Sequence, residues 1–215
     1  MTRTENNLRG IAVQISDYKE KDKMVRAVTD RGVKSLILKS VKSDKAKLRF
    51  AASLFSTVDY YGVGGDMLTV TGANAVEMRY ALADDVKKFA AASVISEAVS
   101  KCLGEDGDST TEFALLDLAL SAINDGNDDP IAVLVWALCK LLTVEGVDFE
   151  DYTLGKGVKT LFRALRDADF TEVGSLDFTR GDFVGAANSA ERLLNHALGV
   201  KLKSLVPALA MLNTL

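Results

Sequence analysis

The hydrophobic pattern of this chain changes its period near residue 80, and that change limits the folds open to it. Before residue 80 apolar and polar residues alternate, as at Ile11, Val13 and Ile15, which is typical of half-buried β-strands. After it, apolar residues recur every three to four positions, as in amphipathic helices. We therefore expect an α+β protein with two domains, residues 1–80 and 81–215.

The first domain contains five short segments with strand character, separated by turns rich in Gly and charged residues. Five strands suit a small barrel of OB type better than a β-sandwich, which needs about seven. The sequence therefore predicts a five-stranded OB-fold barrel. The expected strands are residues 10–16, 23–30, 32–41, 54–63 and 66–80.

The second domain has apolar stripes at helical spacing and is expected to form an all-α bundle. Pro130 marks the first turn of one helix, where proline is favoured. That helix is apolar on nearly all sides, which predicts a place at the centre of the bundle. The expected helices are residues 84–103, 109–124, 131–142, 154–165 and 183–202.

The net charge of −4 conceals an asymmetry between the two domains. Residues 1–80 hold 14 Lys and Arg against 9 Asp and Glu, whereas residues 81–215 hold 12 against 21. A basic first domain indicates an anionic ligand. The acidic second domain is suited to solvent or to a basic protein partner.

Six cations lie between residues 34 and 49. Lysines discourage pairing at sheet edges, but that role accounts for one or two of them more easily than for six. The stretch therefore predicts contacts with the phosphates of a nucleic acid. Two consecutive tyrosines point to opposite faces of a strand, so one of them can stack on a base. The candidate DNA-binding residues are Lys34, Lys39, Lys42, Lys45, Lys47, Arg49, Tyr60 and Tyr61.

No group of residues has the spacing of a catalytic site, so we expect a protein that is not an enzyme. The glycines at 62–65 indicate a hairpin turn, because no helix or Gly-Lys-Ser/Thr sequence follows them. Cys102, Cys139 and the single His196 cannot supply the four ligands of a Cys/His zinc site. We expect neither a metal nor another cofactor.

The longest apolar run, residues 131–139, is far shorter than the ~20 residues that cross a bilayer. The first ten residues also lack the apolar stretch of a signal peptide. We therefore expect a cytoplasmic protein whose two cysteines stay reduced.

The order of these segments resembles the RecO family of bacterial recombination mediators. The similarity continues through residues 137–151 and ends at residues 193–205, so it covers nearly the whole chain. The matching positions in the first domain are Tyr18, Glu20 and Asp22 in a charged turn, Thr29, Arg31 and Gly32 at the next reversal, and Lys39, Lys42, Lys45, Lys47 and Arg49 in a basic linker with Leu48 and Phe55.

The resemblance implies a non-enzymatic DNA repair protein with an N-terminal OB-fold and a helical domain. Members bind single- and double-stranded DNA and anneal strands coated with single-strand-binding protein. Together with RecR they help RecA replace that protein, so the nucleoid is the expected location. Many relatives carry four zinc-binding cysteines after the helix that ends here near residue 142. Residues 146–157 lack that segment, so zinc is not carried over.

Family members hold the acidic, Phe-ended tail of single-strand-binding protein on the helical domain. Such a tail requires an apolar pocket with cations at its rim. On a helix that continues to residue 202, three leucines would share one face; the alternative is that they only close the core. The candidate partner-binding residues are Arg192, Leu194, Leu198, Lys201, Leu202 and Lys203.

Two other classes of function stay open. One is an OB-fold protein that binds RNA, which a comparison of matched DNA and RNA strands would separate through the 2′-hydroxyl. The other is an interaction protein that has lost DNA binding, which would show no salt-sensitive affinity for DNA.

Overall fold

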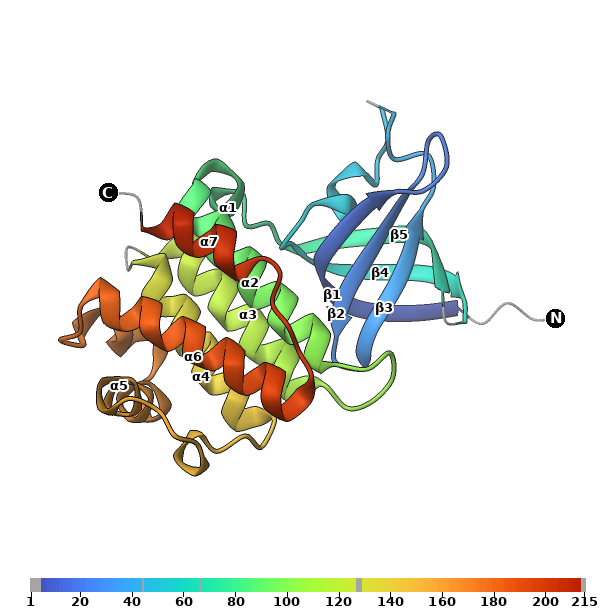
Figure 1. Ribbon diagram of the computed structural model, residues 1–215. Helices are drawn as coiled ribbons and strands as arrows, with labels where there is room; N and C mark the ends of the chain where they lie inside the picture. The colour runs from blue at the N-terminus through green and yellow to red at the C-terminus, as the bar shows by residue number, and fades with distance from the viewer. Residues whose placement is uncertain (1–4, 44, 66, 127–128, 214–215) are drawn as a thin grey trace. The chain divides into compact units, whose positions relative to one another are not determined.

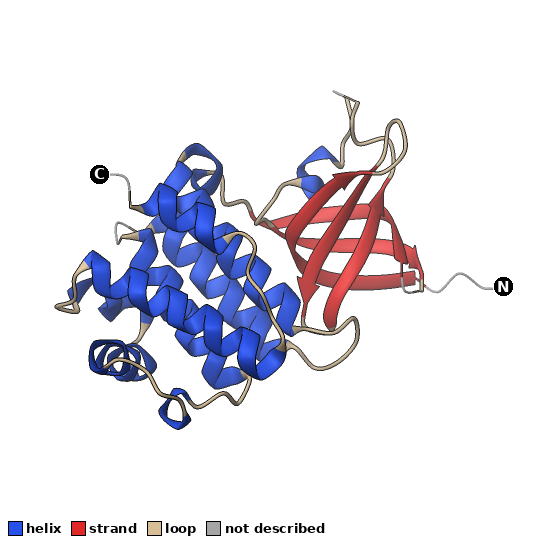
Figure 2. Ribbon diagram, viewed as in Figure 1, coloured by secondary structure: helices blue, strands red, loops and turns tan. Residues whose placement is uncertain are grey.

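Five strands form a barrel that closes on itself, and helices follow it (Figures 1 and 2). The computed structural model describes residues 5–213 except 44, 66, 127 and 128. The expected α+β class and five-stranded OB-type barrel are confirmed. The strands are β1 (Glu5–Asp17), β2 (Lys23–Thr29), β3 (Gly32–Leu38), β4 (Thr57–Gly64) and β5 (Met67–Glu77).

The barrel closes in the order β1-β2-β3-β5-β4, with β4 returning to β1. Residues 35–38 of β3 run parallel to residues 67–70 of β5, and the other pairs are antiparallel. β1 is long enough, at 13 residues, to pair with β4 through its first half and with β2 through its second. Because side chains alternate along each strand, closure places one face of every strand inside.

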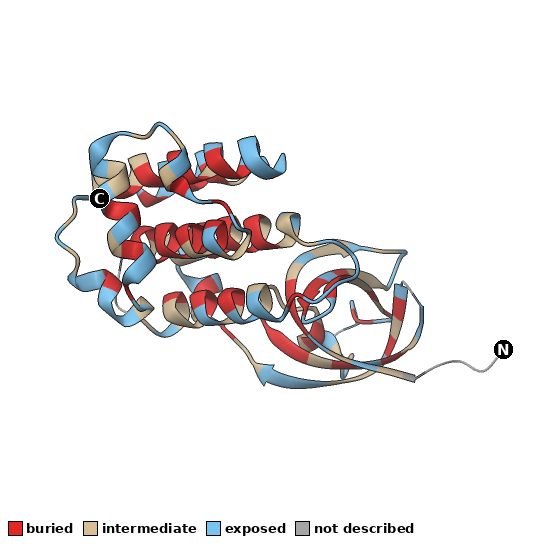
Figure 3. Cartoon of the chain, turned by 90° about the horizontal axis from the view of Figure 1, so that it is seen from below, coloured by how far each residue is buried: buried red, intermediate tan, exposed pale blue. Residues whose placement is uncertain are grey.

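Apolar side chains such as Val25, Leu36, Val58 and Leu68 fill the interior of the barrel. Figure 3 colours the chain by burial, and buried residues alternate with exposed ones along the strands. The positions that alternate with them face outward and are available to a ligand.

A buried arginine holds the start of β4. The fully covered guanidinium of Arg79 donates to the carbonyl of Phe55 and to Oγ1 of Thr57, each at 2.9 Å. Phe55 has a φ of 64°, which no extended strand contains. This left-handed residue explains why β4 begins at Thr57 and not at residue 54.

The five predicted helices are present, and α4 begins at Pro130 as expected. α4 packs against α2, α5 and α6 and is buried on nearly all sides, which confirms its predicted place at the centre of the bundle. Among the described residues, no helix has the length and apolar character needed to cross a membrane. The helices are α1 (Ala81–Asp84), α2 (Val86–Cys102), α3 (Thr110–Asp125), α4 (Pro130–Val144), α5 (Lys156–Asp167), α6 (Arg180–Leu198) and α7 (Leu205–Leu212).

The last predicted helix, residues 183–202, ends earlier than expected. Gly199 has a φ of 70°, and its N–H donates to the carbonyl of Asn195 at 3.0 Å. The N–H of Val200 reaches back to the carbonyl of Leu194, which completes the usual glycine stop of a helix. The prediction of a continuous helix to residue 202 is therefore wrong, and α7 is a separate element that the sequence pattern did not predict.

The chain divides into two compact units, and one segment that follows α2 in sequence belongs to the first of them. The first unit contains the barrel and Leu103–Phe113, and the second contains Tyr80–Cys102 and the residues from Ala114 onward. Within the first unit, the N–H of Val33 donates to the carbonyl of Gly104 and the N–H of Ser109 to that of Asp30, each at 2.9 Å. The division into independently folding domains at residue 80 stays a prediction.

Glu97 of α2 fixes the connection between α6 and α7. Its carboxylate accepts hydrogen bonds from the backbone N–H groups of Lys203 and Ser204, at 3.0 and 2.8 Å, and from Nζ of Lys101 at 2.6 Å. Partial burial raises the pKa of this carboxyl, but the donors, including the Ser204 hydroxyl, outweigh burial and lower the pKa to about 2. Glu97 therefore stays charged while α7 is docked.

We expect the substitution Glu97→Gln to lower the free energy of unfolding at neutral pH by about 1–3 kcal/mol, because hydrogen bonds to a charged acceptor are lost. The carboxylate stabilises the fold above its unfolded pKa of 4.5, and that contribution is lost as the pH falls toward 2. Urea unfolding should therefore show the wild-type advantage shrinking across this range. Glu191→Gln on α6 is the matched control, and equal stability of the two variants at neutral pH would contradict this role.

Candidate nucleic-acid interface

One row of outward side chains crosses four strands of the barrel. Arg26 of β2 lies beside Ser35 of β3, which lies beside Met67 of β5. Gln14 of β1 pairs with Arg26 on the other side. Residues in register share a face of the sheet, and Arg26, Met67 and Gln14 are exposed. The row therefore presents a guanidinium and an apolar thioether on the same surface.

A second row lies next to the first, one pleat further along. Met24, Ile37 and Thr69 are in register across β2, β3 and β5. Lys39 follows β3 and, together with Met67 and Thr69, lines a surface hollow of about 420 Å³. A partly apolar surface edged by cations is suited to a single-stranded nucleic acid, whose bases need contact area and whose phosphates need charge.

The linker after β3 carries most of the predicted cations. Val41 is buried, and Leu48 and Phe50 pack against the barrel core, so the linker is held close to the barrel. Lys42 pairs with Asp17 at 2.9 Å, and this hydrogen bond lowers the pKa of the Asp17 carboxyl. The exposed cations of the linker that have no described ion pair are Lys39, Lys45 and Lys47; Arg49 is also exposed.

Lys34 does not join this group. It pairs in register with the buried Ala27, whereas its neighbour Ser35 belongs to the outward row. Its ammonium donates to the carbonyl of Glu105 at 2.6 Å and forms an ion pair with Asp106. Lys34 therefore holds residues 103–113 to the barrel in this structure, instead of standing free for a phosphate.

The two tyrosines point to opposite faces, as their alternation predicts. Tyr60 is fully buried and donates its hydroxyl to the carbonyl of Ala51 at 3.0 Å, and burial raises the pKa of its hydroxyl. Tyr61 is 37% exposed, and its hydroxyl accepts a hydrogen bond from the amide of Asn74 at 3.2 Å. Tyr60 is part of the core, so Tyr61 is the member of the pair that can meet a base.

Arg26 is the cation that the charge pattern of the sequence did not reveal. It lies in β2, outside the basic stretch of residues 34–49, so a count of the charges in that stretch does not include it. Its position between the buried Val25 and Ala27 is the signal that could have found it, because the residue between two inward positions must face outward.

The candidate partner-binding residues do not form one helix face. Leu194 and Leu202 are buried, whereas Leu198, the last residue of α6, is 39% exposed. Leu202 lies in the connection to α7, beyond the glycine stop. The exposed members of the set are Arg192, Leu198, Lys201 and Lys203.

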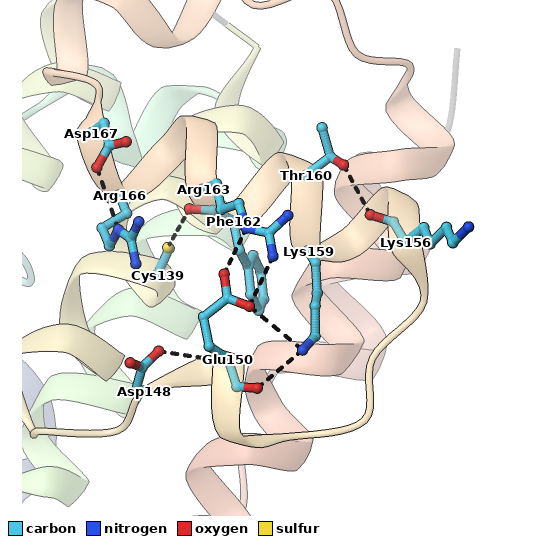
Figure 4. A network of polar contacts seen from close by, with 10 residues as sticks. All are labelled: Cys139, Asp148, Glu150, Lys156, Lys159, Thr160, Phe162, Arg163, Arg166 and Asp167. Carbon is cyan, nitrogen blue, oxygen red and sulfur yellow. Dashed lines mark hydrogen bonds and ion pairs between the residues drawn. The ribbon is translucent and has the colours of Figure 1, made fainter.

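The connection between α4 and α5 is closed by an aromatic pair and by an ion-pair network around Glu150, of which Figure 4 shows the network. Phe149 packs edge-on against Phe162 of α5, with ring centroids 5.3 Å apart. Glu150 accepts two hydrogen bonds from Arg163, at 2.6 and 2.9 Å, which lower the pKa of its carboxyl, and Lys159 lies 3.6 Å away. These contacts fix a short link directly between the two helices.

Cys139 lies next to this link and is a core residue. Its thiol donates to the carbonyl of Phe162 at 3.5 Å, and burial raises its pKa to about 12. Cys102 and Cys139 do not form a disulfide. Over the part of the chain that the structure describes, no three His, Cys, Asp or Glu side chains are grouped to hold a metal ion.

Family models match both units of the chain. The model for "Recombination protein O N terminal" matches residues 1–79, and the model for "Recombination protein O C terminal" matches residues 83–150. The observed architecture, an OB-type barrel followed by helices, agrees with this pair of matches. The chain belongs to the RecO family.

The chain is similar to DNA repair proteins named RecO from staphylococci. The DNA repair protein RecO of Staphylococcus saprophyticus is 26% identical over 144 residues, which are 64% of this chain and 55% of the relative. The protein of the same name from Staphylococcus epidermidis is 27% identical over 124 residues, 55% of this chain and 47% of the relative. The chain spans about half the length of these relatives.

We expect a chelator to leave the melting temperature of this protein unchanged, because aromatic and ion-pair contacts close the α4–α5 connection and no metal-ligand group occurs among the described residues. In contrast, Phe149→Ala should lower the free energy of unfolding by about 3–5 kcal/mol, the usual cost of removing a buried Phe. Calorimetry with and without EDTA, together with elemental analysis for zinc, checks both statements. Stoichiometric zinc or unfolding by EDTA would contradict the first.

Proposed function

We propose that this chain is a non-enzymatic DNA repair and recombination mediator that binds single- and double-stranded DNA through its barrel. The observation that carries the proposal is the outward surface of the barrel, where Arg26 of β2, Lys39 after β3 and Tyr61 of β4 accompany exposed apolar side chains. Its setting supports the same conclusion, because this surface lies on the OB-type barrel of a RecO family member.

The cations of this surface supply the affinity. Five of them, Arg26, Lys39, Lys45, Lys47 and Arg49, are exposed and lie on the outward rows or the adjoining linker. If each meets one phosphate of a single strand, the logarithm of the binding constant falls with the logarithm of salt concentration at a slope of about −3 to −4. Contacts of this kind do not depend on base sequence.

Annealing follows from the same electrostatics. Two complementary strands repel each other through their phosphates, and a basic surface that holds both reduces that repulsion. Base pairing then supplies the free energy of the product, and no covalent step is required. The assistance to RecA, together with RecR, rests on the family resemblance.

Reversing two linker cations tests the DNA surface. We expect Lys45→Glu/Lys47→Glu to weaken binding to all single-stranded sequences alike and to reduce the salt slope by about 1–2. Lys87→Glu/Lys156→Glu, which changes the net charge equally on the helical unit, is the matched control. Fluorescence anisotropy at several salt concentrations measures both. An unchanged affinity in the linker variant would place the DNA surface elsewhere.

The two alternative classes of function, an RNA-binding protein and an interaction protein, predict different results in the same binding titration. An RNA-binding protein would prefer an RNA strand over the DNA strand of the same sequence, because the 2′-hydroxyl distinguishes them. An interaction protein without DNA binding would show no salt-dependent affinity for either strand. A strand-annealing assay then separates a mediator from a protein that only binds.

The helical unit is the proposed site for the acidic, Phe-ended tail of single-strand-binding protein. Leu198 is exposed at the end of α6, and Lys201 and Lys203 follow it in the connection to α7. Glu97 and Lys101 hold this connection, since Lys101 also donates to the carbonyl of Lys201 at 2.6 Å. An apolar contact bordered by two lysines suits a peptide of this chemistry.

A synthetic tail peptide tests this partner. We expect micromolar binding that Leu198→Asp weakens at least about tenfold, because the variant removes the apolar contact and adds a repelling charge. Leu118→Asp on α3 is the matched control, since Leu118 is 40% exposed and Leu198 is 39% exposed. Calorimetric titration measures the affinity, and circular dichroism checks the fold. Equal weakening in both variants would contradict a site at the end of α6.

A further inference from the structure

Tyr61 lies along the outer surface of the barrel, over a glycine. It is in register with Gly72 of β5, and a Cβ built on Gly72 would lie 3.8 Å from both Cβ and Cδ2 of the tyrosine. At the other end of the side chain, the hydroxyl accepts a hydrogen bond from the amide of Asn74, also on β5, at 3.2 Å. The side chain therefore runs along β5, with one face of its ring toward the strand and the other toward solvent.

The position of this ring is set before a ligand arrives. Gly72 has no side chain that would lift the ring from the sheet, and the Asn74 amide holds its hydroxyl. Thr71 donates its hydroxyl to the carbonyl of Tyr61 at 3.3 Å, which ties the two strands together at this point. An exposed aromatic face of fixed orientation is a platform on which an unpaired base stacks, and a fixed platform loses little freedom on binding.

The surface hollow of about 420 Å³ lies next to this ring. Val63, two residues after Tyr61 on the same face of β4, lines the hollow and is in register with Thr69. Met67 adds a thioether to the apolar lining, and the hydroxyl of Thr69 adds a polar group. Positions two residues apart on a strand are separated by about 7 Å, so neighbouring bases of an extended strand can occupy the ring and the hollow.

The charge around the hollow suits a nucleic acid strand. Lys39 follows β3 on one side of β5, whereas Tyr61 belongs to β4 on the other side. Lys39 lines the hollow, and none of the described residues that line it is acidic. A phosphate at this edge therefore meets a cation whose charge no described lining residue offsets.

We infer that this surface of β4 and β5 binds unpaired bases: one base stacks on Tyr61, the next enters the hollow, and Lys39 meets their phosphate. The inference rests on the proposed function and adds base contacts to the phosphate contacts described there. Every base has an aromatic face, so binding of this kind tolerates any sequence. It does require that the bases are unpaired.

The base contacts distinguish the substrates of annealing from its product. In a duplex the bases are paired and stacked inside the helix, so they cannot reach the Tyr61 ring or the hollow. Phosphates remain accessible in both forms. As two strands pair on this surface, the base contacts are lost, and the product is held by phosphates alone. Pairing therefore releases the strand from Tyr61 and frees the surface for the next strand.

The experiment compares three ligands of the full chain by fluorescence anisotropy: a single strand, an abasic strand of equal length, and the annealed duplex. Tyr61→Leu keeps an apolar side chain over Gly72 but removes the ring. We expect it to weaken single-strand binding about tenfold, because a stacked base is lost. Its affinity for the abasic strand and for the duplex, and its salt slope, should stay unchanged, because no phosphate contact is lost. Tyr61→Phe, which keeps the ring, should bind the single strand like the wild type.

Tyr80→Leu is the matched control, because Tyr80 is exposed but belongs to the second unit, and it should change none of the three affinities. A strand carrying 5-iodouracil tests the stacking without a variant, since irradiation should crosslink it to Tyr61, which mass spectrometry identifies.

Two results overturn the inference: no crosslink on β4 or β5, or a Tyr61→Leu variant that loses no affinity or loses it equally for all three ligands. Binding of the abasic strand by the wild type then leaves the proposed DNA surface standing. If the wild type binds none of the three ligands, the proposed function fails together with the base site.

Discussion

The short parallel pairing between β3 and β5 is the constraint on which the rest of the barrel unit depends. Four residue pairs, from Ser35 and Met67 to Leu38 and Val70, join the two strands and close the sheet. Closure turns Leu36 and Leu68 inward and leaves Ser35, Ile37 and Met67 on the outer face. The core and the proposed DNA surface are therefore two consequences of a single register, and a shift by one residue would exchange them.

The local sequence was sufficient to predict the α+β class, because the period of the hydrophobic pattern depends only on residues that are close in the chain. It also located β2, β3, β4 and β5 to within three residues at each end, whereas β1 begins at Glu5, five residues before its expected start. Alternation separated the faces of Tyr60 and Tyr61. The start of β4 was displaced because Phe55 adopts a left-handed conformation that the buried Arg79 supports. The end of α6 was missed because Gly199 was assigned to the helix interior instead of its stop.

The candidate site was harder to predict because it depends on which residues meet across strands. Lys34 is adjacent in sequence to the outward row, yet its amine is held by residues 105 and 106, more than seventy positions away. Arg26 lies outside the basic stretch of residues 34–49 but is in register with Ser35, which in turn is in register with Met67. A count of charges along the chain shows neither the long-range contact of Lys34 nor the cross-strand register of Arg26.

The return of residues 103–113 to the barrel has a consequence for the order in which this chain is made. A nascent chain released only as far as residue 80 contains all five strands but lacks the partners of the Val33 amide and the Asp30 carbonyl. Residues 103–113 follow α2 in the chain, so α2 must leave the ribosome before they can pack on the barrel. The barrel therefore reaches its final form only after synthesis of the helical unit has begun, so translation couples the two units in time although each has its own core.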